Sequence, residues 1–81
     1  MASRHAGLGS QVRYWDEAAD AALEVRLVDP RSADKLDGDL PVLSPLGIAL
    51  IGMGVGQTGL IPDRRGGERR LRVLQVERAF P

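Results

Sequence analysis

Apolar and polar positions alternate along several short segments of this 81-residue chain, and such alternation is typical of half-buried β-strands. Residues 12–16 (VRYWD) are rich in side chains that favour strands. In residues 23–28 (LEVRLV), the odd-numbered positions are apolar and would share one face. Asp29 and Pro30 follow, and the proline ends this second strand because it cannot continue the hydrogen-bond ladder.

Three further short strands are predicted toward the C-terminal side, at residues 40–43, 57–62 and 71–76. Gly66 and Gly67 lie between the last two and suit a tight turn that needs positive φ angles. Apolar positions in the last strand change face between Val73 and Leu74. This change predicts either a β-bulge or partial cover on both faces of the sheet.

A helix is predicted to begin at Ser44 and Pro45. Proline holds the preceding residue in an extended conformation, serine is a favoured N-cap, and proline is favoured at the first helical position. The following apolar residues recur at helical spacing: Leu46, Ala49, Leu50 and Met53. Gly52 or Gly54 would end the helix in a left-handed conformation. A helix of about two turns needs support from a sheet, so we expect an α+β fold with a bent antiparallel sheet of about five strands around it.

The glycines of residues 43–62 do not match a nucleotide-binding loop. A dinucleotide motif beginning at Gly52 needs glycine where Gln57 stands. A phosphate-binding P-loop needs lysine and a hydroxyl residue where Leu60 and Ile61 stand. We therefore expect no nucleotide cofactor, and we interpret these glycines as ending the helix and redirecting the chain.

Metal and membrane sites are not expected either. The chain has no cysteine, which excludes disulfides and thiolate ligands. Asp34, Asp37 and Asp39 lack the spacing of a calcium-binding loop. No apolar run approaches the ~18 residues of a membrane helix, so a cytoplasmic protein is expected. Residues 1–8 are predicted to form a flexible tail, and residues 9–81 a single domain.

Charge is distributed unevenly along the chain, although the net charge is zero. Residues 1–62 carry five basic and eight acidic groups, a net −3, and residues 63–81 carry six basic and three acidic groups, a net +3. A neutral chain gains little from phosphates, so sequence-specific nucleic-acid binding is not expected. Strand alternation would expose Arg70 and Arg72 together, either as a solvated edge or as a basic patch for an acidic protein surface.

The segment SPLGIALIGMGVG resembles the S-P-x-x-x-A-L-[IL]-G-x-x-x-G signature of the C-terminal domain of the GreA and GreB transcript-cleavage factors, a signature shared by Rnk, the regulator of nucleoside diphosphate kinase. The flanking segments are similar as well, namely GSQVRYWD, LEVRLVDPRSADKLDGDLPVLSP and GGERRLRVLQVE. The resemblance covers residues 9–78. Leu43 stands where the cleavage factors carry an acidic residue or asparagine, which is more similar to Rnk.

The resemblance implies an FKBP-like fold that docks on bacterial RNA polymerase beside the secondary channel, at the coiled-coil tip of the β′ subunit. Ser44 and Pro45 match the polymerase-contacting corner, which would also include Leu43, although helix capping alone would explain the Ser-Pro pair. In the cleavage factors a helical hairpin carries the carboxylates that hold a catalytic Mg²⁺. The eleven residues before Val12 are too few for such a hairpin, so no enzymatic activity is expected.

Two other functions are compatible with the sequence. The first is a protein-interaction or oligomerisation domain that has lost polymerase binding, since Leu43 and Met53 are apolar where the cleavage factors are polar. The second is a minimal FKBP-type prolyl isomerase. Such an isomerase lines its pocket with several aromatic residues, and this chain has three aromatic residues in all. His5 lies in the predicted tail and suggests no catalytic group.

Overall fold

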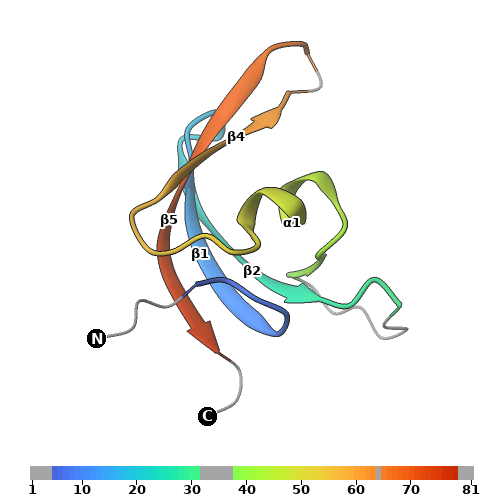
Figure 1. Ribbon diagram of the computed structural model, residues 1–81. Coiled ribbons are helices and arrows are strands. Elements are labelled where there is room, and N and C mark those ends of the chain that lie inside the picture. Colours follow the sequence, from blue (N-terminus) through green and yellow to red (C-terminus); the bar gives the residue numbers. More distant parts are fainter. Residues whose placement is uncertain (1–4, 32–37, 64, 79–81) are drawn as a thin grey trace.

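The computed structural model describes residues 5–31, 38–63 and 65–78. The elements follow in the order β1 (Ser10–Asp16), β2 (Ala21–Val28), β3 (Asp39–Pro41), α1 (Pro45–Leu50), β4 (Thr58–Pro62) and β5 (Glu68–Arg78). The strands curl into a half-barrel, and α1 lies in its hollow (Figure 1). Each predicted strand and the predicted helix are confirmed, with the helix beginning at Pro45 as expected.

The sheet has the strand order β3-β2-β1-β5-β4. β1 is antiparallel to both of its neighbours, and β4 is antiparallel to β5. The expectation of an antiparallel sheet is wrong at one edge, because β3 runs parallel to β2 with Leu27 opposite Leu40. Asp39 lies opposite Arg26, so β3 runs alongside the last residues of β2. The described sheet is therefore mixed.

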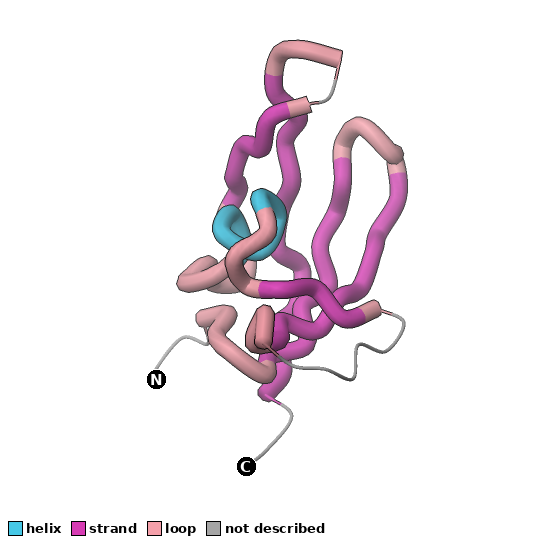
Figure 2. The backbone as a smooth tube through the Cα atoms, turned by 90° about the vertical axis from the view of Figure 1, so that its right-hand side faces the viewer, coloured by secondary structure: helices cyan, strands magenta, loops and turns pink. Residues whose placement is uncertain are grey.

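The core lies between the concave face of the sheet and α1 (Figure 2). Its buried apolar residues are Ala6, Val12, Tyr14, Leu27, Leu50, Ile61, Leu71, Val73 and Val76. Leu50 is fully buried, and the other residues of the predicted helical stripe pack against this cluster. The stripe is confirmed as the face of the helix that contacts the sheet.

A β-bulge in β5 explains the change of apolar face noted in the sequence. Arg13 is opposite Gln75 and Tyr14 is opposite Val73, so Leu74 is the additional residue. The bulge allows Val73 and Val76 to face the core together. A bulge also increases the local twist of the strands, which suits a sheet that curls around a helix.

The folded part of the chain begins before the expected boundary at residue 9. Ala6 is 3% exposed and belongs to the core. Its N–H donates to Met53 O at 2.8 Å, and its carbonyl accepts from Gly52 N at 2.7 Å. His5 forms a β-bridge with Gly54. The glycine-rich segment after α1 offers backbone groups that need partners once they are covered, and residues 5–6 supply them.

The Ser44 hydroxyl joins β3 to α1. It accepts from Gly47 N at 3.1 Å and donates to Pro41 O at 2.6 Å. At the other end of the helix, Ile51 N donates to Gly47 O at 2.9 Å. Gly52 follows with a φ of +81°, so it is Gly52 rather than Gly54 that takes the left-handed conformation directly after the helix.

Gly47 allows the first turn of α1 to lie directly on the chain leaving β3. A Cβ at this position would lie 2.9 Å from both Val42 Cα and Val42 O, and it would also collide with Pro41 O. These neighbours are backbone atoms and cannot move as a flexible side chain can. The position of the helix against β3 therefore requires glycine here.

We expect Ser44→Ala to lower the free energy of unfolding by about 1 kcal/mol, the usual cost of losing an N-cap. The substitution removes the bonds to both Gly47 N and Pro41 O. Denaturant titration followed by circular dichroism measures the effect. Ser44→Thr keeps a hydroxyl and serves as the control. An unchanged midpoint in Ser44→Ala would show that the cap contributes nothing to stability.

We expect Gly47→Ala to destabilise the fold by about 1–3 kcal/mol, the range for overpacking a close contact. Gly7→Ala is the matched control, because a Cβ at Gly7 meets nothing within 4 Å. That control should stay within about 1 kcal/mol of the wild type. The same denaturant titration compares the two variants. Equal stability in both would contradict the close approach of α1 to β3.

Candidate protein-docking site

The corner between β3 and α1 combines an exposed apolar side chain with a fixed backbone. Leu43 is 69% exposed, and Pro45 is exposed beside it at the start of the helix. Ser44 is partly buried, and its hydroxyl is already bonded within the fold. Leu43 and Pro45 can therefore offer apolar area to a partner, whereas Ser44 holds the corner in place.

Apolar exposure continues along the outer side of α1. Ile48 is 58% exposed and Ile51 is 40% exposed, and residues three apart from Pro45 onward share one side of a helix. The whole segment of residues 40–62 contains no charged side chain. We call Leu43, Pro45, Ile48 and Ile51 the corner surface.

The sequence analysis missed Ile48 and Ile51 because it looked for the buried side of the helix. The signal was present, since Pro45–Leu50 (PLGIAL) has no polar side chain on any side. A helix that is apolar all round is buried on more than one side, and this one faces the core on one side only.

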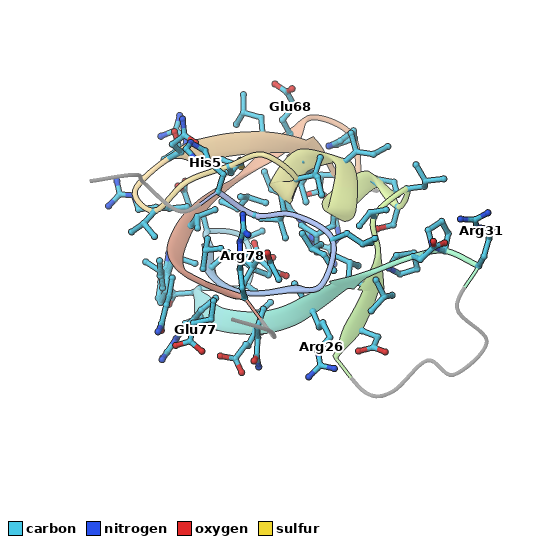
Figure 3. All side chains as sticks on the ribbon, turned by 60° about the horizontal axis from the view of Figure 1, so that its bottom comes forward. His5, Arg26, Arg31, Glu68, Glu77 and Arg78 are labelled. Carbon is cyan, nitrogen blue, oxygen red and sulfur yellow. The ribbon has the colours of Figure 1, made fainter. Side chains whose placement is uncertain are left out.

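Arg70 and Arg72 are exposed together, as predicted. They lie on the convex face of the sheet, where Arg70 is opposite Leu60 on β4 and Arg72 is next to Trp15 on β1. Figure 3 shows Glu77 and Arg26, which share this convex face, on the side of the sheet turned away from α1. The structure therefore does not bring the arginine pair together with the corner surface.

Two surface pockets lie near the arginine pair and near the corner surface, respectively. On the convex face a hollow of about 420 Å³ is lined by Trp15, Thr58, Arg70, Arg72 and Leu74. The second hollow, of about 510 Å³, lies between the corner and the β4–β5 hairpin. Its lining includes Leu40, Pro45, Leu46, Ile61, Arg65 and Arg69. We call this second hollow the hairpin cleft.

An ion pair that the sequence analysis missed lies beneath the hairpin cleft. Asp16 is 3% exposed, and its Oδ1 accepts from the backbone N–H groups of Ala18 and Ala19 at 3.0 and 3.3 Å. Its Oδ2 lies 3.6 Å from Arg69 Nη2. Burial raises the pKa of the neighbouring Tyr14 hydroxyl, and the Asp16 carboxylate raises it further.

Arg69 differs from Arg70 and Arg72 because it points into the concave side. Alternation from Leu71 and Val73, both buried, places residue 69 on the same face as the core. That alternation was visible in the sequence, but only Arg70 and Arg72 were singled out from it. The structure places Arg69 apart from Arg70 and Arg72.

Among the described residues, neither a cluster of metal-ligating side chains nor a membrane-spanning helix is found. Within residues 5–31, 38–63 and 65–78, no three His, Asp or Glu side chains are placed to hold a metal ion. Asp34 and Asp37 of the acidic loop lie outside the described residues. In the same part of the chain, no helix has the length and apolar character to cross a membrane.

Solved structures similar to this fold are bacterial transcription factors. Gfh1 from Thermus aquaticus is 31% identical with a TM-score of 0.78, and the match covers 93% of this chain and 49% of that one. The GreA/GreB elongation factor from Nitrosomonas europaea is 28% identical with a TM-score of 0.72, covering 94% and 62%. GreA factor homolog 1 of Thermus thermophilus is 32% identical with a TM-score of 0.73, covering 94% and 50%.

This chain spans about half the length of the two Gfh1 proteins, at 49% and 50%. A comparison with curated protein sequences gives no match. The family model described as "Transcription elongation factor, GreA/GreB, C-term" matches residues 2–78, which include the Ser44–Pro45 corner, α1 and all five described strands. The chain therefore belongs to the family of C-terminal domains of the GreA/GreB transcription elongation factors.

Proposed function

We propose that this domain is a non-catalytic binding module that docks on bacterial RNA polymerase, near the secondary channel and at the coiled-coil tip of the β′ subunit. The observation that carries the proposal is the corner surface. Leu43, directly before the family signature, is 69% exposed, so the fold leaves most of its apolar area uncovered. Family membership supports a role in transcription elongation.

The corner is suited to docking because it is already ordered. The Ser44 hydroxyl and the close contact at Gly47 fix the backbone on both sides of Pro45. A partner therefore loses little affinity to ordering this segment. Burying Leu43 is worth about 1.5–3 kcal/mol, which corresponds to roughly one to two factors of ten in affinity.

Within the family, we propose that the domain is closer to Rnk than to the cleavage factors. Leu43 and Met53 are apolar at positions where the cleavage factors carry polar residues, and Ile48 and Ile51 extend the apolar surface. This composition favours an apolar contact over the electrostatic contact of the cleavage factors. A link to nucleoside diphosphate kinase would follow from the same relationship.

The positions of the aromatic residues disfavour a prolyl isomerase. Tyr14 is 2% exposed on the concave face, whereas Trp15 is 39% exposed on the convex face. Adjacent residues of β1 point to opposite faces, so these two rings do not line a common pocket. Phe80, the third aromatic residue, lies outside the described residues.

We propose a separate acidic contact for Arg70 and Arg72. Because the pair lies on the face opposite α1, one flat partner surface cannot cover both the pair and the corner surface. The arginine pair would therefore meet a second protein surface, separate from the one that covers the corner surface. The corner surface is the primary contact in this account.

We expect Leu43→Asp to weaken binding to bacterial core RNA polymerase at least tenfold, because a carboxylate replaces apolar area that docking would bury. Leu60→Asp is the matched control, since Leu60 is 53% exposed on the convex face. Biolayer interferometry with immobilised domain measures both affinities. Binding that is unchanged in Leu43→Asp, or equally weakened in both variants, would contradict docking through the corner.

A further inference from the structure

Arg69 has more hydrogen-bond donors than the fold satisfies. A guanidinium carries about five N–H donors. Asp16 Oδ2 lies 3.6 Å from Arg69 Nη2. This distance exceeds the range of about 2.7–2.9 Å that is usual for a charge-assisted hydrogen bond between nitrogen and oxygen. Arg69 Nε is covered and has no hydrogen-bond partner among the described residues. A covered donor without a partner destabilises the fold, so an acceptor that reached it would be bound favourably.

The hairpin cleft gives access to this side chain. The Arg69 side chain is 35% exposed and lines the cleft together with Arg65. Apolar side chains of Leu40, Leu46 and Ile61 contribute to the lining. The cleft therefore combines apolar walls with a guanidinium at its inner side, and it has room for a side chain in its volume of about 510 Å³.

We propose that the hairpin cleft binds an aspartate or glutamate carboxylate that a protein partner presents next to an apolar residue. The carboxylate would accept two parallel N–H bonds from Arg69, the pairing for which the planar guanidinium is suited. A small rotation of the Arg69 side chain would bring Nε into that pairing. The apolar neighbour would contact Leu46 and Ile61.

The charges around the cleft favour a single carboxylate over a multivalent anion. Asp16 already offsets part of the charge of Arg69, and the Asp63 carboxylate lies on the rim, where its Oδ1 accepts from Arg65 N at 3.1 Å. Two arginines and one aspartate give the lining a net charge of +1, and Asp16 beneath Arg69 largely offsets it, so the lining does not suit a multivalent anion. The apolar walls would strip water from a free hydrated ion without replacing its hydrogen bonds, whereas a peptide side chain brings its own apolar area.

Asp16 is a positioning residue in this account. Its Oδ1 is fixed by the Ala18 and Ala19 amides, and its Oδ2 holds one end of the Arg69 side chain. A long side chain that is held at one end loses less conformational freedom when it binds a ligand. The ion pair leaves the remaining donors of Arg69 for the partner.

The test does not depend on polymerase. Domain labelled with ¹⁵N is titrated with the blocked tripeptide Ac-Leu-Asp-Leu-NH₂, with its neutral analogue Ac-Leu-Asn-Leu-NH₂, and with sodium acetate and inorganic phosphate. The Arg69 Nε–Hε signal is assigned by its loss in Arg69→Lys. We expect this signal to move saturably with the aspartate peptide and at least tenfold more weakly with the asparagine peptide, because bonds to a charged group are worth about 1.5–3 kcal/mol.

The proposal is wrong if the Arg69 signal does not move with the aspartate peptide, or if the asparagine peptide binds with equal affinity. It is also wrong if acetate or phosphate binds as tightly as the aspartate peptide or more tightly. Arg69→Lys keeps a positive charge near Asp16 but loses the planar donor pair, so it should weaken peptide binding at least fivefold. Arg26→Lys, at an exposed arginine of the convex face, should leave it unchanged, and a loss in both variants would also contradict the site.

Discussion

The corner surface depends on the two hydrogen bonds of the Ser44 hydroxyl. One oxygen atom accepts from the first turn of α1 and donates to the end of β3, so the strand and the helix cannot separate without breaking both bonds. Gly47 completes the junction, because only a residue without Cβ fits against the Val42 and Pro41 backbone. A short helix that would be unstable alone is thereby held in the hollow of the sheet, with Leu43 left outside.

The curl of the sheet then separates two surfaces of different chemistry. On the concave side, α1 covers the core and the hairpin cleft opens beside it, with Arg69 at its inner side. On the convex side, Arg70 and Arg72 lie beside Trp15. The bulge at Leu74 keeps the apolar residues on both sides of it facing inward. The corner surface and the arginine pair therefore lie on opposite faces of the domain.

Local signals predicted most of the elements, and long-range pairing accounts for what the sequence did not reveal. The helix start was predictable because Ser44 and Pro45 each favour that position for a separate physical reason. The parallel pairing of β3 with β2 was not predictable, because the residue pattern of a short strand does not show in which direction the strand runs. Ala6 joins the core through backbone bonds to the glycine segment, and any residue with a free N–H and carbonyl could make them. The Asp16–Arg69 pair needed the register between β1 and β5, which the bulge shifts.

The central claim is that the outer side of the β3–α1 corner is the docking surface. Site-specific photocrosslinking to core RNA polymerase tests this claim most directly. A photoreactive phenylalanine would replace Ile48, which is 58% exposed on α1, or Leu60, which is 53% exposed on the convex face. The account predicts a crosslink to the β′ subunit from position 48 and none from position 60. A crosslink from position 60 alone, or no crosslink from position 48 in a complex that forms, would contradict it.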